Sequence, residues 1–322
     1  MRIVIALGGN ALLRRGEKPD ARIQLHHIQA AANALAPLAM QHELLICHGN
    51  GPQVGLLALE SESDAVLSRP YPLDDLVAQT QGMIGYWLAQ SLRNAGVTKP
   101  ILSLVTQTLV DSADPAFASP TKFVGAGYGP ERAREMAERH GWKIAEDGAR
   151  WRRVVPSPEP CRVIEQESIT SLLQAETVVI CAGGGGAPVL QDTNGQLSGV
   201  EAVVDKDDVA ALLAIHVHAD RLLILTDVPA VMKDFGTPEA EQLRRIDLHQ
   251  LTRMHFPAGS MRPKVQACAR FALVTGQPAT IGALVDAAAL LAGAAGTTIT
   301  RRAVEPASTP DRTAGLLANS SS

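Results

Sequence analysis

Three clusters of glycine each follow a short apolar run that is typical of a strand buried on both faces. They are Gly8-Gly9 with the following Asn10, the Gly49-Asn50-Gly51 turn, and four consecutive glycines at 183–186. In an open parallel sheet, ligands collect at the carboxyl ends of the strands. Bare backbone N–H groups at such an edge suit an anion, usually a phosphate or a carboxylate. One cluster alone could be a tight turn that needs a positive φ, but three clusters predict an anion-binding edge.

Three lysines lie in unusual sequence settings. Lys122 lies in "SPTKFVG", Lys206 is surrounded by aspartates in "VVDKDD", and Lys264 follows a proline at the expected start of a helix. A lone lysine at a helix start is usually a solvated surface group. Phosphoryl transfer, however, requires two anionic reactants held in line and neutralisation of the transferred charge. Lysines that reach in from separate loops, with an aspartate such as Asp207 fixing their direction, are suited to that chemistry.

Several common functional motifs are absent from the sequence. No Gly-Lys pair exists, so there is no Walker P-loop. No glycine cluster extends to GxGxxG, which disfavours a nicotinamide dehydrogenase and leaves that function only as a fold-level analogy. The "KDFG" segment has no accompanying HRD or VAIK motif, and neither GxSxG nor HExxH is present. The net charge of −4 provides no basic field for nucleic acid. The four cysteines lie far apart without a CxxC pair, which favours reduced thiols over a zinc site. We therefore expect no metal held by the protein alone.

The apolar pattern predicts an α/β fold, with helix layers on a mainly parallel open sheet. Strand-like runs at 3–8, 44–47, 101–110, 177–182, 222–226 and 280–282 alternate with helical patterns at 23–39, 74–95, 208–216, 263–275 and 285–292. The segment 112–158 breaks this alternation with Pro, Gly and charge, and predicts an inserted flap that contains a helix at 130–140 and a hairpin. Residues 303–322 suggest a disordered tail. With no apolar run of about 18 residues and no room for a signal peptide before the first strand, we expect a cytoplasmic protein without a membrane partner.

Eight motifs, in this order, resemble those of the carbamate kinases within the amino acid kinase fold. They are "ALGGNAL", "HGNGPQVG", "AQTQGMIGYWLAQ", "VVPSPEP", "ICAGGGGAPV", "VVDKD", "LTDVPAV" and "AGSMRPKV". The resemblance implies a three-layer α/β/α sandwich over residues 1–302. Its acceptor side would be 1–176 and its nucleotide side 177–302, with a small protruding subdomain inserted at about 112–158. It also implies the reaction ATP + carbamate ⇌ ADP + carbamoyl phosphate, magnesium carried by the nucleotide phosphates, a homodimer, and use for ATP synthesis at the end of a catabolic path.

The resemblance also implies roles for individual residues. Lys206 would stabilise the transition-state charge, Asp207 would orient the lysines, Lys122 would reach in from the flap, and Lys264 would contact the nucleotide phosphates. Carbamate and the transferring phosphoryl group would lie against Gly8, Gly9, Asn10, Gly49, Asn50 and Gly51. The nucleotide would lie along Gly183, Gly184, Thr226, Asp227, Gly259, Met261 and Lys264.

The chain departs from the family pattern at four positions. Arg262 stands where the family usually has glycine, Phe123 and Ala126 replace prolines, and Cys161 replaces a lysine that we expect at the surface. Arg262 either tightens phosphate binding or blocks the close backbone approach that glycine permits, and a looser flap would change closure or substrate choice. Two alternatives therefore stay open. One is a kinase of the same fold for another small carboxylate or phosphate, and the other is a catalytically idle nucleotide-binding paralogue.

Overall fold

A computed structural model describes residues 1–301, except 10, 11, 15, 51, 65 and 257–260. An eight-stranded sheet forms its centre, and only the β16–β17 pair in it is antiparallel. The strand order is β15 (Arg245–Asp247), β17 (Thr297–Thr300), β16 (Ala279–Ala283), β12 (Arg221–Thr226), β1 (Arg2–Leu7), β2 (Glu43–His48), β9 (Val178–Cys181) and β3 (Ile101–Ser103). The expected mainly parallel α/β architecture is confirmed.

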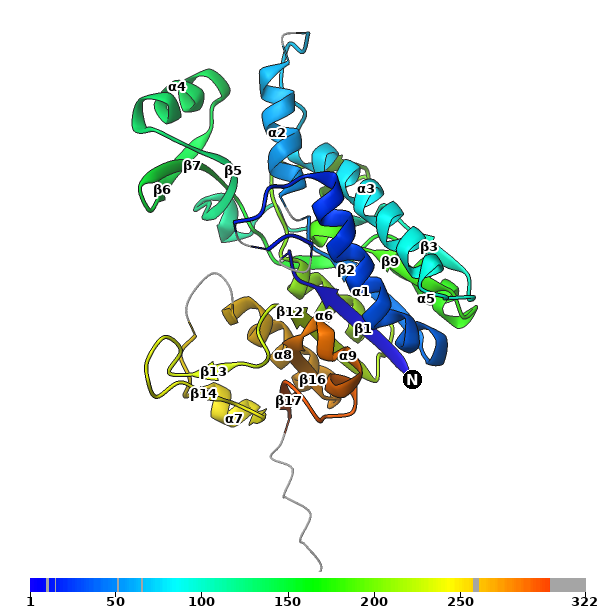
Figure 1. Ribbon diagram of the computed structural model, residues 1–322. Helices are drawn as coiled ribbons and strands as arrows, with labels where there is room; N and C mark the ends of the chain where they lie inside the picture. Colours follow the sequence, from blue (N-terminus) through cyan, green and yellow to red (C-terminus); the bar gives the residue numbers. More distant parts are fainter. Residues whose placement is uncertain (10–11, 15, 51, 65, 257–260, 302–322) are drawn as a thin grey trace, which may run out of the picture.

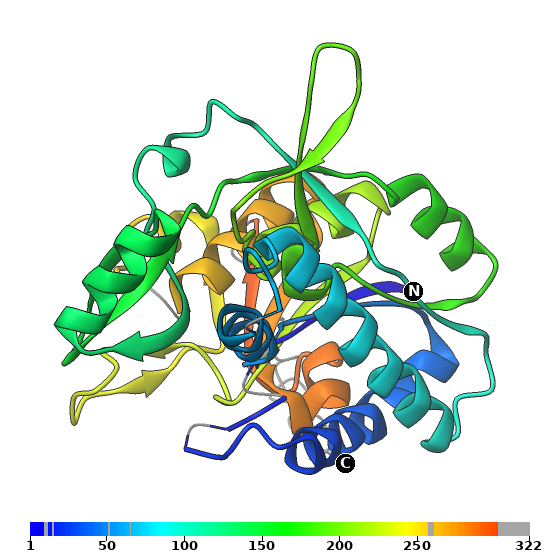
Figure 2. The same ribbon diagram turned by 90° about the horizontal axis from the view of Figure 1, so that it is seen from above.

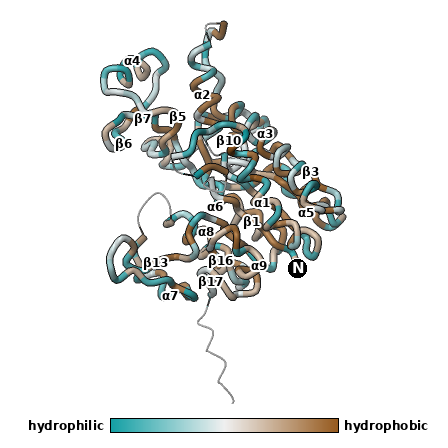
Figure 3. Tube along the Cα trace, in the orientation of Figure 1, coloured by the Kyte–Doolittle hydropathy of each residue, from teal (hydrophilic) through white to brown (hydrophobic). Residues whose placement is uncertain are grey.

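Helices cover both faces of this sheet (Figures 1 and 2). One face packs on α1 (Ala21–Gln41), α3 (Leu73–Asn94) and α9 (Ala287–Leu291), and the other on α5 (Gln166–Gln174), α6 (Lys206–His216) and α8 (Met261–Thr275). The two-residue period of β1 divides its side chains accordingly: Ile3 and Ile5 join the first core and Val4 and Ala6 the second, all fully buried. Apolar residues follow the central strands, whereas α4 is largely hydrophilic (Figure 3).

The apolar run 101–110 is not one strand, contrary to the sequence prediction. It divides into β3 in the main sheet and β4 (Gln107–Val110) in a four-stranded sheet with β8 (Pro160–Val163), β10 (Ala187–Gln191) and β11 (Leu197–Gly199). At the break, the buried Gln81 side chain accepts a hydrogen bond from the Thr106 backbone N–H (3.0 Å) and donates one to its carbonyl (3.1 Å). These bonds replace the ladder bonds of the sheet, so the chain can leave it without unpaired polar groups.

Within the segment 112–158, residues 122–155 form a small unit that we call the protruding subdomain. β5 (Lys122–Tyr128), β6 (Lys143–Asp147) and β7 (Arg150–Val155) form a three-stranded sheet, and α4 (Pro130–His140) has the bounds that the sequence predicted. The unit stands off the main sheet beside α2 (Gln53–Ser63) (Figure 1). Gly141 ends α4 in the left-handed conformation, with φ +70°.

The remaining elements are short. They are β13 (Met232–Lys233), β14 (Glu241–Gln242), α7 (Leu248–Leu251) and 3₁₀ turns at Pro115–Phe117, Gly183–Gly185 and Leu284–Asp286. The predicted helix at 285–292 is therefore a 3₁₀ turn followed by the short α9. The predicted tail at 303–322 lies outside the described residues. Within the described part of the chain, no helix is long and apolar enough to cross a membrane.

Candidate active site

The first two glycine clusters allow the ends of three neighbouring strands to approach closely. Gly8 N–H donates to the Leu225 carbonyl at 2.8 Å, and Gly49 N–H donates to the Leu7 carbonyl at 3.0 Å. A Cβ on Gly8 would lie 3.0 Å from the Leu225 oxygen, and one on Gly49 would lie 3.2 Å from the Gly9 nitrogen. Neither Gly8 nor Gly49 has a positive φ. These glycines therefore keep the strand edge free of side chains rather than form left-handed turns.

The third glycine cluster packs directly on the second. A Cβ on Gly184, which has φ +64°, would lie 2.1 Å from the amide of Asn50, and one on Gly183 would lie 2.4 Å from the His48 ring. Asn50 Oδ1 in turn accepts a hydrogen bond from the Thr80 hydroxyl at 3.1 Å. Burial lowers the pKa of His48 to about 4, so its ring is neutral at pH 7. Gly184 thus fixes the position of Asn50 through a contact that any larger side chain would prevent.

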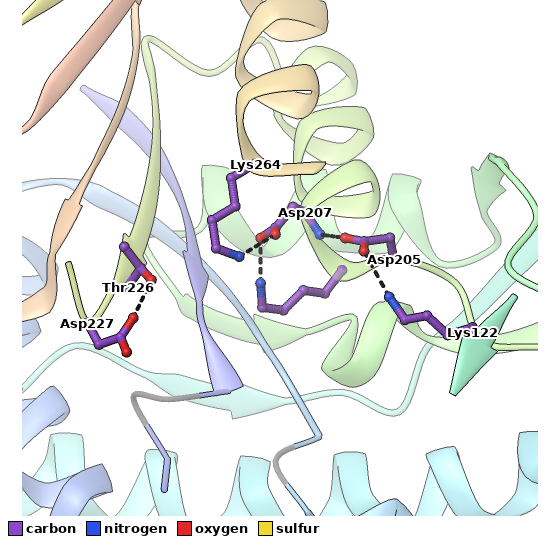
Figure 4. Close-up of polar contacts among 7 residues, drawn as sticks. Lys122, Asp205, Asp207, Thr226, Asp227 and Lys264 are labelled. Atoms are coloured by element: carbon purple, nitrogen blue, oxygen red, sulfur yellow. Dashed lines mark hydrogen bonds and ion pairs between the residues drawn. The ribbon is translucent and has the colours of Figure 1, made fainter. Parts of the chain in front are cut away.

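Asp207 joins two of the predicted lysines. One of its carboxylate oxygens lies 2.5 Å from Lys206 Nζ and the other lies 2.9 Å from Lys264 Nζ (Figure 4). Lys206 and Asp207 open α6, and Lys264 lies in the first turn of α8, so residues 57 positions apart meet at one carboxylate. The side chains are only 11%, 3% and 15% exposed for Lys206, Asp207 and Lys264. Two ammonium groups therefore face the site with one shared counter-charge.

This arrangement keeps Asp207 and Lys264 ionised at neutral pH. Burial alone would raise the pKa of Asp207, but the attraction of Lys206 and Lys264 and their hydrogen bonds outweigh burial and lower it. For Lys264 burial acts to lower the pKa, and the charge and hydrogen bond of Asp207 outweigh it, so the pKa is raised. The net positive charge of the trio, at the N-terminal ends of two helices, attracts an anion.

Lys122 enters the site from the protruding subdomain. Its Nζ lies 3.2 Å from Asp205 Oδ2, while Asp205 Oδ1 caps α6 by accepting from the Asp207 N–H at 2.9 Å. The Lys122 side chain is 41% exposed, so this ion pair is weak and easily exchanged. Asp205 thus links the subdomain to the helix that carries Asp207.

A cavity of about 530 Å³ brings most of these groups together. Of the predicted residues, Gly49, Asn50, Lys122, Gly184, Lys206, Asp207 and Lys264 line it. Gly8, Gly9, Gly183, Thr226, Asp227 and Met261 do not line it, and Asn10, Gly51 and Gly259 lie outside the described residues. Thr226 donates a hydrogen bond to Asp227 at 3.0 Å at the end of β12, apart from the lysine cluster in Figure 4. The cavity therefore contains the predicted phosphoryl-transfer groups but not the whole predicted nucleotide path.

The sequence prediction missed two charged residues of this cavity, Asp205 and Arg152. Asp205 stood beside Lys206 in the sequence, and its position before α6 was the available signal for a helix cap. Arg152 belongs to the predicted hairpin, but sequence alone did not show which side of the hairpin faces the cavity. The departures Phe123 and Ala126 line the cavity, whereas Arg262 is exposed on the first turn of α8. Cys161 is exposed, as predicted.

Comparisons with known proteins agree with this fold. The profile of the amino acid kinase family matches residues 1–283. Carbamate kinase from Rhizobium meliloti (strain 1021) is 48% identical to this chain over 302 residues, which cover 93% of each chain. Carbamate kinase from Escherichia coli (strain K12) is 47% identical over 297 residues, which cover 92% of this chain and 98% of the relative. A solved structure, carbamate kinase from Giardia lamblia bound to AMP-PNP, superposes with a TM-score of 0.87 at 38% identity, covering 93% of this chain and 98% of that one. The chain belongs to the amino acid kinase family, and within it to the group of the carbamate kinases.

Proposed function

We propose that this protein is a carbamate kinase that transfers a phosphoryl group reversibly between ATP and carbamate. The observation that carries the proposal is the buried Lys206–Asp207–Lys264 cluster beside the glycine-lined edge of the sheet. The names of the relatives supply the acceptor, carbamate. The AMP-PNP complex of the Giardia lamblia relative supports an adenine nucleotide as the other reactant.

The chemistry needs charge neutralisation more than proton transfer. A carbamate oxygen attacks the γ-phosphorus of ATP, a new P–O bond forms, and the bond to the ADP oxygen breaks. Because the carbamate carboxylate is already ionised, no general base has to remove a proton. Lys206 and Lys264 would offset the charge of the transferring group, with Asp207 fixing both ammonium groups in place. Lys122 would add a third positive charge when it exchanges Asp205 for substrate.

The two reactants would enter from opposite sides of the cavity. In our proposal the nucleotide lies along β12 and the start of α8, and the acceptor lies toward α2 and β5. Magnesium would arrive with the nucleotide phosphates, whose oxygens are ligands that it prefers. In the described part of the chain, no three His, Cys, Asp or Glu side chains gather into a metal site. Magnesium would neutralise part of the phosphate charge before transfer.

Physiological direction and assembly belong to the same proposal. We propose that the enzyme forms ATP from carbamoyl phosphate in a catabolic path and acts as a cytoplasmic homodimer. Light scattering coupled to size-exclusion chromatography tests the dimer. An idle nucleotide-binding paralogue is disfavoured, because such a protein has no physical need for two lysines held on one buried aspartate.

Acceptor profiling tests the function. Purified protein with Mg-ATP should release ADP with carbamate much faster than with acetate, aspartate or N-acetylglutamate. Lys206→Ala should lower that rate by at least about 100-fold, the order of losing one transition-state charge contact. Lys233→Ala is the matched control, because Lys233 is a 58% exposed lysine that does not line the cavity. Faster turnover with another carboxylate would move the assignment to a different kinase of this fold.

A further inference from the structure

Arg152 is a cavity-lining cation to which the proposed reaction assigns no role. It lies on β7 of the protruding subdomain and lines the same cavity as Lys122, Lys206 and Lys264. Its side chain is 29% exposed. Two cations of the subdomain, on adjacent strands, thus reach the cavity that holds the buried lysine pair.

The guanidinium of Arg152 is held in place by several contacts. Nη1 lies 2.9 Å from Asp147 Oδ2, Nη2 donates to the Gly125 carbonyl at 3.1 Å, and the group lies over the Phe123 ring at 5.5 Å from its centroid. Its buried Nε has no hydrogen-bond partner among the described residues. A guanidinium fixed in this way loses little side-chain entropy when it binds an anion. The Phe123 ring, at a position where the family usually has proline, supplies one face of this support.

The strand register places Arg152 opposite a bulge in β5. β5 and β7 pair regularly from Lys122 to Val124, and pairing then resumes at Tyr128 opposite Trp151. The intervening residues 125–127 bulge out of the ladder, with Gly125 at φ +68°. The Gly125 carbonyl released by this bulge is one of the groups that hold Arg152.

The balance of charge in the cavity favours an anion at Arg152. Its described lining contains four cations and only two carboxylates, Asp205 and Asp207. Asp207 pairs with Lys206 and Lys264, and Asp205 pairs with Lys122. The partner of Arg152, Asp147, does not line the cavity. Arg152 therefore contributes positive charge that no carboxylate in the cavity lining offsets.

We propose that Arg152 is a substrate-binding residue for the anion on the acceptor side, where it contacts the phosphate of carbamoyl phosphate, and that Phe123 positions it. This inference rests on the proposed carbamate kinase function. The acceptor side is chosen because β5 packs on α2, and Val54, Gly55, Leu56 and Leu59 of α2 line the cavity with Arg152. The nucleotide side begins at Lys264, on the opposite element α8.

Arg150 provides a matched control on the same strand. Its Nη1 donates to the carbonyl of Gly127, as Arg152 Nη2 does to that of Gly125, so both arginines support the bulge. Arg150 does not line the cavity. A purely structural role for Arg152 would therefore be shared by Arg150, whereas an anion-binding role would not.

Steady-state kinetics of ATP formation test the proposal. Arg152→Gln should raise KM for carbamoyl phosphate about 10-fold or more, the order expected for one charge-assisted hydrogen bond. In Arg152→Gln, KM for ADP should stay within about 2-fold of the wild-type value. Arg152→Lys retains the positive charge and should therefore recover part of the loss. Arg150→Gln should have the wild-type KM for carbamoyl phosphate. Phe123→Leu should raise the same KM by a smaller factor without lowering Tm.

Other outcomes overturn the proposal in distinguishable ways. The binding role would be refuted if KM for carbamoyl phosphate were unchanged in Arg152→Gln, or if Arg150→Gln raised it equally. Wild-type turnover would in that case leave the kinase function intact. A larger effect on KM for ADP would place Arg152 on the nucleotide side and also refute it. Absence of wild-type turnover would instead refute the proposed function itself.

Discussion

Replacing Asp207 by asparagine removes the shared counter-charge of two buried lysines while keeping the size of the side chain. In wild type the Asp207 oxygens lie 2.5 and 2.9 Å from Lys206 and Lys264 Nζ. Two unit charges held about 5 Å apart repel by about 3 kcal/mol at an effective dielectric constant of about 20. Removal of one partner from a buried ion pair typically costs about 3–5 kcal/mol. We therefore expect Asp207→Asn to lower the free energy of unfolding by about 3 kcal/mol at pH 7.5.

The pH dependence of this loss identifies its cause. The pKa of Asp207 is lowered in the folded protein, so its contribution is complete above the unfolded pKa and is lost as the pH falls through the folded value. The difference between wild type and Asp207→Asn should therefore narrow in acid below about pH 4. In the variant, the charge of Asp207 no longer offsets the burial of Lys264, so the pKa of Lys264 falls and the folded state releases a proton before the unfolded chain does. The variant should therefore regain stability as the pH rises toward about 10.

Urea unfolding from pH 4 to pH 10, together with kcat at pH 7.5, measures both consequences. The asparagine amide cannot hold two ammonium groups as the carboxylate does, so kcat should fall by about 100-fold or more. Equal stability of the two proteins, or a difference that does not change with pH, would refute the electrostatic reasoning. A lower free energy of unfolding in Asp207→Asn together with an unchanged kcat would show that Asp207 acts only in folding.

Two further predictions follow from neighbouring positions. Burial, with repulsion from Asp205, raises the pKa of Asp208 to about 6. The stability that the protonated Asp208 carboxyl contributes is therefore complete below its unfolded pKa and is lost as the pH rises through about 6. Asp208→Asn should accordingly stabilise the protein above pH 6 by at most about 3 kcal/mol and have no effect near pH 4. A lower free energy of unfolding for Asp208→Asn at pH 7.5 would contradict this prediction. Gly184→Ala should cost more than about 2 kcal/mol in urea unfolding, because its Cβ would meet Asn50 at 2.1 Å. Gly96→Ala, with φ +93° but open space around it, should cost only about 1 kcal/mol, and equal losses would show that the contact with Asn50 is unimportant.

The central fold was predictable because its strands are continuous apolar runs. β1, β2, β9 and β12 follow from such runs, and the first three of them lead into glycines. The insertion at 112–158 was predicted from the opposite signal, a break in the alternation that is rich in Pro, Gly and charge. The division of 101–110 into two strands was not predictable, because it depends on the Gln81 side chain that binds the Thr106 backbone from another element. The local sequence composition does not indicate such a long-range contact.

The candidate site was predictable in its residue types but only partly in its geometry. Asp207 was expected to orient the lysines, and the structure places both Lys206 and Lys264 on it. The resemblance to a family supplied the pairing with Lys264, since charge patterns do not show which distant helix start lies alongside. Arg152 escaped prediction because the bulge at 125–127, whose Gly125 carbonyl binds it, leaves only a weak glycine signal in the sequence.

The most direct test of the account is the initial rate of ATP formation from Mg-ADP and carbamoyl phosphate by the purified wild-type protein. A carbamate kinase should form ATP rapidly, consume one carbamoyl phosphate for each ATP, and show a rate that saturates in both substrates. ADP binding detected by calorimetry without ATP formation would contradict this function, because the cavity would then hold a nucleotide without transferring a phosphoryl group.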